Sequence, residues 1–368
     1  MNHLVYFTFG GQEGSVYATQ VKQLLNYWCK RHGWKVTLIQ IADDKNFNGL
    51  DSSIEQIFIK RKSKLLFSFQ FNAYLRAIKN ELQFRSDDTL YFNSRGASAF
   101  SIATKFIEVY NLDVQCNNLD VRGTIEEFKI SNFRKLFYLY FKNETKKALK
   151  KATSITTVTS NLKEHLLSSF NINPQAKINV NPTLSILENS FKSNKKNIAY
   201  IGKIAWIDVK VFVEQLLKIN KLFLSHGWNI SIIGNSSGSF GLEAHGVKIV
   251  ERMTPDELAE YITNYHTGIV LRDNSIINKV AAPCKISDYL CLGMPVIYSG
   301  EIGSLKDFTA QFPECKKFIV HINEFENNAR VEQHLAINQD DLSLLSMNAQ
   351  KYFGVEAVID RYITIFNS

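Results

Sequence analysis

Short, apolar, β-rich runs alternate with longer amphipathic stretches along the whole chain. In the first half these runs fall at residues 3–9, 35–42, 89–95 and 154–160. The first run ends in a glycine loop, Gly10-Gly11-Gln12-Glu13-Gly14, and residues 15–31 then carry apolar side chains at helical spacing. Strands that alternate with helical stretches are typical of parallel sheets with helical crossovers. The sequence therefore predicts an α/β protein with doubly wound sheets.

The alternation is interrupted once, at the polar and charged residues 188–196, where we place a linker. It resumes with β-rich runs at 197–203, 229–234, 247–252, 267–272 and 295–299, separated by helical stretches such as 209–225 and 255–265. A chain of 368 residues is also long for one core. We predict Rossmann-like domains at 1–185 and 186–345. The amphipathic stretch 355–366 predicts a helix in the segment 346–368 that packs across both domains.

The composition limits the location and the partners. The five cysteines are odd in number, scattered and free of C-x-x-C pairs, which argues against a disulfide framework and a zinc site and favours a reducing cytoplasm. The N-terminal residues show no export signal, and no apolar run is long enough to cross a bilayer. The formal charge of +8 favours anionic partners: nucleotide diphosphates, lipid headgroups or nucleic acid.

Residues 283–297, PCKISDYLCLGMPVI, predict a short helix followed by a buried strand. Pro283 suits a first helical turn, and Gly293 suits a C-terminal cap. The helix start would offer free amides and a positive dipole end to an anion such as a diphosphate, and Lys285 would add a full charge. One turn later, Asp288 could accept hydrogen bonds from ribose hydroxyls. An ordinary βαβ connection with the same glycine and proline punctuation is the alternative.

This segment resembles the signature P-x-K-h-x-E-Y-L-A-x-G-x-P-V-I of retaining GT-B glycosyltransferases of family four. A short glycine loop follows in that family, here residues 299–303. The resemblance implies the GT-B fold, in which two Rossmann-like, doubly wound domains face each other across a cleft. It also implies a nucleotide-sugar donor site in the C-terminal domain.

The resemblance carries a donor site onto named residues of this chain. Lys203 corresponds to a basic residue that reaches the diphosphate. Arg252 and Met253 would lie against the base. Arg272 would contact phosphate; the alternative is an ordinary surface charge. The full donor set is Gly14, Lys203, Gly234, Arg252, Met253, Arg272, Asn278, Pro283, Cys284, Lys285, Ile286 and Asp288. Val280 stands where the family has the first glutamate of a pair, so Asn278 is the substitute that would contact the transferred sugar.

An acceptor side is implied in the N-terminal half. Residues 120–127, DVRGTIEE, resemble the D-x-R-G-x-x-x-E segment of a bacterial branch of the family, and residues 91–96 are similar to another turn that lines the cleft. The acceptor-side set is Gly11, Arg95, Asp120, Arg122 and Glu127. The alternative is structural: an Asp–Arg pair that fixes a strand-to-helix turn. We place Asp120, Arg122, Lys203 and Lys285 at the reaction centre, and find no clear cleft histidine.

The implied reaction moves a sugar from a nucleotide-diphosphate donor to an acceptor hydroxyl with retention of configuration, and we expect the donor to be a UDP-sugar. Fixed cations would stabilise the leaving diphosphate, so we expect neither a metal ion nor a cofactor besides the nucleotide sugar. Similar enzymes act in cell-envelope or surface polysaccharide synthesis, which implies a glycan or lipid-linked acceptor. Two rival functions stay open: a sugar-nucleotide epimerase of the same fold, and a non-catalytic protein that binds anionic lipid or RNA. The sequence lacks an RNA-binding fingerprint, so no nucleic-acid partner is expected.

Two stretches mix aromatic residues with lysines, at 60–69 and 133–151. Such stretches can lie on anionic lipid, which predicts a peripheral location at the inner face of the cell membrane. The alternative is a helix whose aromatic side chains enter the N-terminal core while its lysines face solvent.

Overall fold

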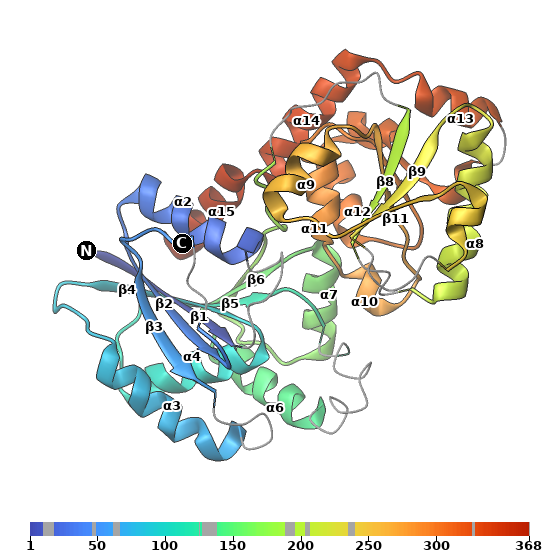
Figure 1. The fold of residues 1–368 in the computed structure, drawn as a ribbon. Helices are drawn as coiled ribbons and strands as arrows, with labels where there is room; N and C mark the ends of the chain where they lie inside the picture. The colour runs from blue at the N-terminus through green and yellow to red at the C-terminus, as the bar shows by residue number, and fades with distance from the viewer. Residues whose placement is uncertain are drawn as a thin grey trace. The chain divides into compact units, whose positions relative to one another are not determined.

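The computed structural model describes residues 1–9, 18–45, 49–61, 67–124, 126, 138–187, 196–202, 207–234, 240–325 and 328–367. The chain forms two compact units (Figure 1). Unit 1 comprises Met1–Pro182 and Val358–Ser368, and unit 2 comprises Thr183–Ala357. The predicted glycine loop at 10–14 lies outside the described residues.

Unit 1 is built on a parallel sheet with helices on both faces. Its strands, in the order β3-β2-β1-β4-β5-β6-β7, are β1 (Asn2–Phe9), β2 (Lys35–Ala42), β3 (Glu55–Lys60), β4 (Thr89–Arg95), β5 (Cys116–Val121), β6 (Ser154–Thr157) and β7 (Lys177–Val180). Its helices are a π-helical turn (Ala18–Lys22), α2 (Gln23–His32), α3 (Phe67–Glu81), α4 (Ala97–Val109), α6 (Tyr138–Leu149), α7 (Ser160–Ser169) and α15 (Val355–Asn367), which joins unit 1 from Val358 on.

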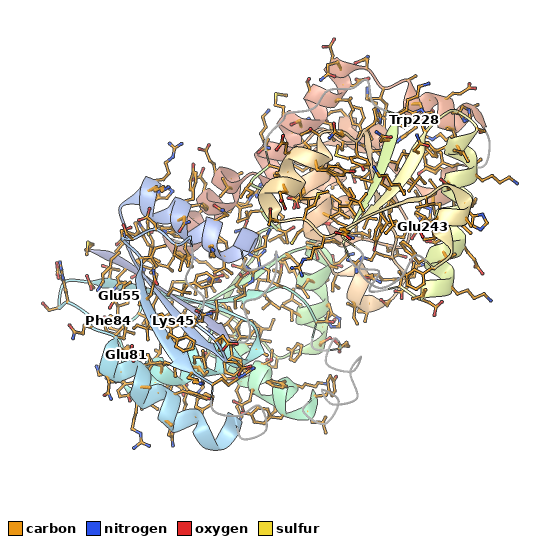
Figure 2. All side chains as sticks on the ribbon, in the orientation of Figure 1. Lys45, Glu55, Glu81, Phe84, Trp228 and Glu243 are labelled. Carbon is orange, nitrogen blue, oxygen red and sulfur yellow. The ribbon has the colours of Figure 1, made fainter. Side chains whose placement is uncertain are left out.

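The composition of the central strand explains this arrangement. β1 is buried along almost its whole length, as expected of a parallel strand covered on both faces. On one face, Phe7 stacks on Phe92 with ring centroids 5.6 Å apart. On the other face, Trp28 of α2 packs against Phe366 of α15 at 5.5 Å. Phe84, labelled in Figure 2, closes the amino end of the sheet against the ring of His3.

Unit 2 repeats the design with a smaller parallel sheet. Its strands, in the order β10-β9-β8-β11-β12-β13, are β8 (Asn197–Ile201), β9 (Asn229–Ile233), β10 (Lys248–Val250), β11 (Thr267–Val270), β12 (Val296–Tyr298) and β13 (Ile319–His321). Its helices are α8 (Val209–Leu224), α9 (Pro255–Ile262), α10 (Ile276–Lys279), α11 (Cys284–Cys291), α12 (Gly303–Gln311), α13 (Asn328–Leu335) and α14 (Gln339–Phe353). Trp228, also labelled in Figure 2, packs edge to face on Phe223 in its core.

The strand orders confirm the prediction of two doubly wound sheets. In each sheet the order reverses next to its first strand in the chain, between β1 and β4 and between β8 and β11. Ligands of such sheets bind outside the carboxyl ends of the strands at this reversal. In unit 2 the residues that follow β8 and β11 are therefore the first place to look for a site.

Candidate functional site

Two glycine turns and a helix start meet at the carboxyl edge of the unit 2 sheet. Gly202 follows β8 and Gly234 follows β9, and a Cβ atom built on Gly234 would lie 3.8 Å from the Cα of Gly202. The two glycine turns thus lie in van der Waals contact, and neither carries a side chain of its own. An open backbone surface of this kind admits a phosphate closely.

The predicted helix and strand of residues 283–297 are confirmed as α11 and β12. Pro283 is the residue before the helix, and Gly293 follows it with a φ angle of 80°. A side chain at Gly293 would stand 2.8 Å from the carbonyl oxygen of Leu342, so only glycine allows α14 to approach this turn. No side chain of Pro283 caps this helix start, which is the end of a helix that carries the positive dipole an anion prefers.

Lys285 is the cation of this helix start. Its Nζ lies 4.2 Å from the ring centroid of Tyr200 at the end of β8, and 3.9 Å from the position of a Cβ on Gly202. Burial, and then the charge of Arg272, lower the pKa of Lys285 to about 7. Within the described part of the chain, Lys285 forms no ion pair with a carboxylate. An anion bound beside Gly202 would therefore restore the charge of the ammonium group.

Arg272, which follows β11, is a second partly buried cation at this edge. Its guanidinium donates to Oδ1 of Asn278 at 3.2 Å, and the amide of Asn278 donates in turn to Oδ1 of Asp273 at 2.7 Å. Its peptide N–H donates to Oγ of Ser299 at 2.9 Å. Burial lowers the pKa of Arg272, as expected for a cation withdrawn from water. The bond to Asn278 fixes the direction of the guanidinium and the bond to Ser299 fixes the backbone of Arg272, unlike in an ordinary surface arginine.

Asn278 is one of the candidates for a contact with the transferred sugar. Its side chain is buried and bridges Arg272 and Asp273 with both ends of its amide. This bridge orients the arginine. A contact of Asn278 with the sugar stays a prediction.

Asp288 lies one turn after Lys285 on α11 and is partly buried. Burial raises the pKa of its carboxyl to about 7, against a hydrogen bond from Ser185 that lowers the pKa. The Ser185 Oγ donates to Oδ1 at 2.8 Å. Among the described residues, Oδ2 has no hydrogen-bond partner. One carboxyl oxygen is thus held by the protein, and the other is available.

The remaining predicted donor residues are spread along the same helix and strand ends. Ile286 is fully buried in the core, so only its backbone could reach a ligand, whereas Cys284 is partly exposed. Arg252 is exposed and Met253 partly buried after β10. The N–H of Gly234 donates to the carbonyl oxygen of Val250 at 2.9 Å, which places these residues at the same edge of the sheet.

Four predicted site residues lie outside the described residues: Gly11, Gly14, Glu127 and Lys203. Three residues that the structure adds to the site were not predicted: Ser185, Tyr200 and Ser299. An aromatic residue just before the glycine turn was the only sequence signal for Tyr200. Ser185 comes just before the predicted linker, far in sequence from the signature segment, and carried no signal.

The acceptor-side candidates of unit 1 form a compact polar cluster. Arg122 donates through Nε to Oδ1 of Asp120 at 2.6 Å, and through its other nitrogens to the carbonyl oxygens of Asn181 and Pro182 and to the hydroxyl of Tyr362. Asp120 is fully buried, and Nε of Arg95 lies 3.8 Å from its Oδ2. This geometry supports the alternative in which the Asp–Arg pair fixes the end of β5. A contact with the acceptor stays a prediction.

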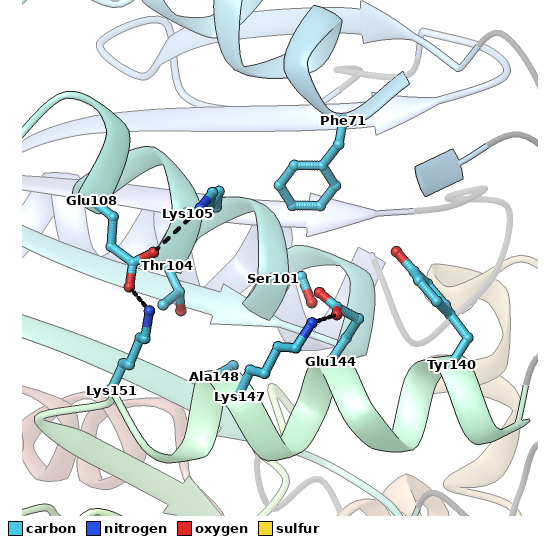
Figure 3. A pocket seen from close by; sticks show the side chains of 10 residues that line it. All are labelled: Phe71, Ser101, Thr104, Lys105, Glu108, Tyr140, Glu144, Lys147, Ala148 and Lys151. Atoms are coloured by element: carbon cyan, nitrogen blue, oxygen red, sulfur yellow. Dashed lines mark hydrogen bonds and ion pairs between the residues drawn. The ribbon is translucent and has the colours of Figure 1, made fainter. Parts of the chain in front are cut away.

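The lysine-rich helix α6 borders a surface hollow between α3, α4 and α6 (Figure 3). Lys147 pairs with Glu144 at 2.7 Å, and Glu108 pairs with Lys105 and Lys151. Thr145, Ala148 and Leu149 form the buried face of this helix, while its lysines are exposed. The aromatic side chains of this helix, Tyr138, Tyr140 and Phe141, are only half-buried, so the core-packing and lipid alternatives both stay predictions; residues 127–137 lie outside the described residues. No described helix has the length and apolar character to cross a bilayer.

No protein-family model matches the sequence, and no curated protein matches it either. The structure is similar to that of sucrose-phosphate synthase from Thermosynechococcus elongatus, with 11% identity, coverage of 100% of this chain and 98% of the other, and a TM-score of 0.69. It is also similar to the lipopolysaccharide outer core galactosyltransferase WaaB in its apo form, with 10% identity, 100% and 99% coverage and a TM-score of 0.65.

A third similar structure is described as trehalose-6-phosphate from E. coli bound with UDP-2-fluoro glucose, with 10% identity, 100% and 99% coverage and a TM-score of 0.66. At such low identity these likenesses establish the fold alone. They confirm the predicted GT-B fold of two parallel-sheet α/β domains.

Proposed function

We propose that this chain is a glycosyltransferase that moves a sugar from a nucleotide-diphosphate donor to an acceptor hydroxyl. The proposal rests on one observation: two partly buried cations, Lys285 and Arg272, lie at the reversal of the unit 2 sheet beside a helix start, and neither forms an ion pair with a described carboxylate. Burying such charges costs free energy unless an anion binds there. A pyrophosphate has the charge and the oxygen atoms to meet both.

The chemistry of glycosyl transfer uses these groups directly. When the bond between the anomeric carbon and the diphosphate oxygen breaks, its electron pair stays on the diphosphate. Lys285, Arg272 and the amides that follow Pro283 would stabilise that developing charge. Asp288, one turn along the helix, would accept from the ribose and so fix the nucleotide. The UDP-2-fluoro glucose of the similar E. coli structure supports a UDP-sugar as the donor.

We propose retention of configuration, on the basis of the resemblance of residues 283–303 to family-four transferases and of residues 120–127 to a bacterial branch. In this scheme the acceptor oxygen bonds to the anomeric carbon on the side from which the diphosphate leaves. The acceptor proton passes to the departing diphosphate oxygen. No protein nucleophile takes part. Proton NMR of the product linkage would identify the stereochemistry, and an inverted product would refute this part of the proposal.

A thermal-shift panel of UDP, GDP, ADP and dTDP sugars tests the donor class. A ligand that binds only the folded chain raises its melting temperature. At a hundredfold excess of ligand over Kd, the free energy of unfolding rises by about 2.7 kcal/mol. We expect one nucleotide series to stabilise the protein, and K285A to lose most of that shift. The matched control is K306A, which removes an exposed lysine of α12. If no sugar nucleotide shifts the melting temperature at millimolar concentration, the proposed function is wrong.

Transfer should not depend on a divalent metal, because protein cations supply the charge at the leaving group. We expect the rate of sugar transfer to be unchanged in excess EDTA. A rate that falls in EDTA and returns with added Mg²⁺ or Mn²⁺ would contradict this prediction.

We further propose an acceptor of the cell envelope or cell surface, a glycan or a lipid-linked sugar, and a cytoplasmic chain that works at the inner face of the membrane. The exposed Lys142 and Lys146 of α6, with Lys150 just after it, support contact with anionic lipid. Flotation with anionic liposomes at low salt tests this point, and a protein that stays at the bottom of the gradient contradicts it.

The rival function, a sugar-nucleotide epimerase, would change a labelled nucleotide sugar without any acceptor.

A further inference from the structure

Ser185 connects the candidate donor site to the segment by which the chain enters unit 2. Unit 2 begins at Thr183, and Ser185 follows closely. Its N–H donates to the carbonyl oxygen of Phe353 at 2.8 Å, and it forms a bridge with Gly354 at the end of α14. Gln350 of α14 also donates to the carbonyl oxygen of Leu187 at 2.6 Å. The backbone around Ser185 is therefore fixed on both sides.

The hydroxyl of Ser185 is directed as well as buried. The N–H of Leu187 donates to its Oγ at 3.2 Å, and the Oγ donates to Oδ1 of Asp288 at 2.8 Å. The side chain of Ser185 is almost fully buried, so water does not compete for this hydroxyl. Because the oxygen already accepts from Leu187, its own proton is directed at the carboxylate.

The contact from Ser185 acts on the Asp288 carboxyl, which is close to half ionised at pH 7. Burial raises the pKa of Asp288 to about 7, and the hydrogen bond from Ser185 lowers it. The titratable neighbours are Tyr289 and Cys291, whose pKa values burial raises well above their ordinary values, so both stay neutral near pH 7. On α14, which packs against α11, the charged residues are Asp340, Asp341 and Lys351, of which Asp341 pairs with Lys317 at 2.7 Å.

We propose that Ser185 is a positioning residue for the ribose of the donor: its hydroxyl holds Oδ1 of Asp288 and leaves Oδ2 to accept from a ribose hydroxyl. This inference rests on the proposed function and adds a residue to it. A charged acceptor binds a hydroxyl more strongly than a neutral one does. Ser185 thus favours both the direction and the ionised form of the carboxylate that the nucleotide needs.

The first test does not depend on nucleotide binding. The carboxyl carbons of aspartate are labelled with ¹³C, the Asp288 signal is assigned by its loss in D288N, and the protein is titrated by NMR. We expect S185A to titrate at a higher pH than the wild type, and S185T to titrate like the wild type. The control is S346A, which removes an equally buried hydroxyl that bonds to the carbonyl oxygen of Cys291 on the same helix. An unchanged titration in S185A would overturn the inference.

The second test measures nucleotide binding by calorimetry. At pH 7 we expect S185A to bind the ribonucleoside diphosphate about tenfold more weakly, the size of one lost hydrogen bond to a charged group. For the 2′-deoxy analogue of this nucleotide, S185A should weaken binding less, because the analogue cannot make the same ribose contacts. S185T should bind the ribonucleoside diphosphate like the wild type. Equal affinities in S185A and S346A would overturn the inference.

The two tests separate the inference from the function. If the wild type binds no nucleotide, the proposed function fails, and the inference that rests on it is withdrawn even where the NMR titration shows the Ser185 contact. If the wild type binds nucleotide and S185A changes neither the titration nor the affinity, the function stands and the inference fails. The melting temperature of S185A is measured in parallel, and S185C, whose thiol is a much weaker hydrogen-bond donor, carries both tests if S185A does not fold.

Discussion

Lys285 and Asp288 stand one helical turn apart on α11, and burial moves their pKa values toward each other from opposite directions. The pKa of the ammonium group falls to about 7, and that of the carboxyl group rises to about 7. The first shift disfavours a positive charge, and the second disfavours a negative one. Each group lacks a partner of opposite charge in the described chain. A ligand that is anionic at one end and rich in hydroxyls at the other would complete both.

Donor affinity should therefore be highest near pH 7. Above this pH Lys285 loses the proton that attracts phosphate, and below it Asp288 gains a proton and accepts less well from ribose. Each single linked proton changes Kd by up to about tenfold per pH unit. The pyrophosphate of a sugar nucleotide is a diester with no pKa in this range, so the profile reports the protein. Calorimetry from pH 5.5 to 8.5 measures it.

Two variants assign the two sides of this profile. In K285R the charge persists, so the loss of affinity above pH 7 should disappear. In D288N the carboxyl group is gone, so the loss below pH 7 should disappear, with weaker binding throughout. A wild-type affinity that is constant from pH 5.5 to 8.5 would refute the prediction.

Tyr289 of α11 holds the carboxyl end of β8 in place beside the candidate site. Its hydroxyl accepts from the N–H of Ile201 at 3.0 Å and donates to the carbonyl oxygen of Ala199 at 3.2 Å, which fixes the end of β8. A Cβ on Gly268 of β11 would lie 2.2 Å from the ring of Tyr289. The ring therefore requires glycine at 268.

G268A should destabilise unit 2 by about 1–3 kcal/mol, the usual cost of overpacking a core. Urea unfolding measures this difference. In the Y289A variant, which removes the ring, adding G268A should lower the free energy of unfolding by much less. A single G268A variant within about 0.5 kcal/mol of the wild type would show that the core relaxes around the methyl group.

At the scale of elements, α11 and α15 have different roles. α11 was predicted from the sequence because a proline, a short amphipathic run and a glycine bound it within a few residues. α15 was predicted as a helix that packs across both domains, but the residues that it contacts could not be named from the sequence. The hydroxyl of Tyr362 on this helix bonds to Arg122, 240 positions earlier in the chain. Only the fold brings these two residues together.

Arg122 should be a structural requirement of unit 1. R122M leaves Asp120 fully buried with Arg95 at 3.8 Å as its remaining cation, so we expect a loss of about 3 kcal/mol in the free energy of unfolding. The double variant R122M/D120N, which removes the uncompensated carboxylate, should lose less. Urea unfolding tests both. If R122M unfolds like the wild type, Arg122 is not a structural clamp, and its predicted role at the acceptor becomes the better explanation.

The strands that the sequence did not predict show what pattern reasoning lacks. β5 has the sequence CNNLDV, which looks too polar for a central strand. In the sheet, Asn118 donates to Asn93 of β4 at 2.6 Å and accepts from Thr156 of β6 at 3.0 Å. Its amide is satisfied only by neighbouring strands that are distant in sequence. β7 and β13 are short edge strands with little alternation.

The same limit applies to the candidate site. Lys285 and Asp288 were predicted because helix geometry alone relates them and a family signature carries them. Tyr200 and Ser185 join them through tertiary contacts, and the pKa shifts come from burial that no local pattern encodes. The guanidinium of Arg272 is likewise oriented by Asn278 of α10, and its backbone is held by Ser299, which follows β12.

At the scale of the whole molecule, buried histidines should make the chain sensitive to acid, and two of them lie side by side in unit 2. Unit 2 buries His266 and His334, whose rings share the hydroxyl of Thr267 at 2.8 and 3.2 Å. Burial lowers the pKa of His266 to about 4, and burial together with His266 lowers that of His334 to about 3. Both are neutral in the folded chain at neutral pH, whereas an unfolded histidine gains a proton near pH 6.5.

Unit 2 should therefore lose stability as the pH falls from about 6.5 to 4. In this window the unfolded state binds more protons than the folded state, so each histidine costs up to about 1.4 kcal/mol per pH unit. Urea unfolding of the W28F/W34F background, which removes two tryptophans of unit 1, is followed by tryptophan fluorescence at pH 7, 6 and 5 and measures the slope. H334Q should be less stable at pH 7 but should show a smaller slope. Equal slopes in H334Q and the wild type would exclude His334 as a source of the acid sensitivity.

The division of the chain also sets an order of events on the ribosome. Unit 2 is one uninterrupted stretch, Thr183–Ala357, whereas unit 1 takes its residues from both sides of that stretch. The helix that carries Tyr362 and Phe366 is therefore synthesised only after every residue of unit 2 has been added. Until it emerges, Trp28 lacks the ring of Phe366 and Arg122 lacks the hydroxyl of Tyr362. The nascent chain can complete unit 2 first, whereas unit 1, although begun earlier, cannot close until the segment after Ala357 has been made.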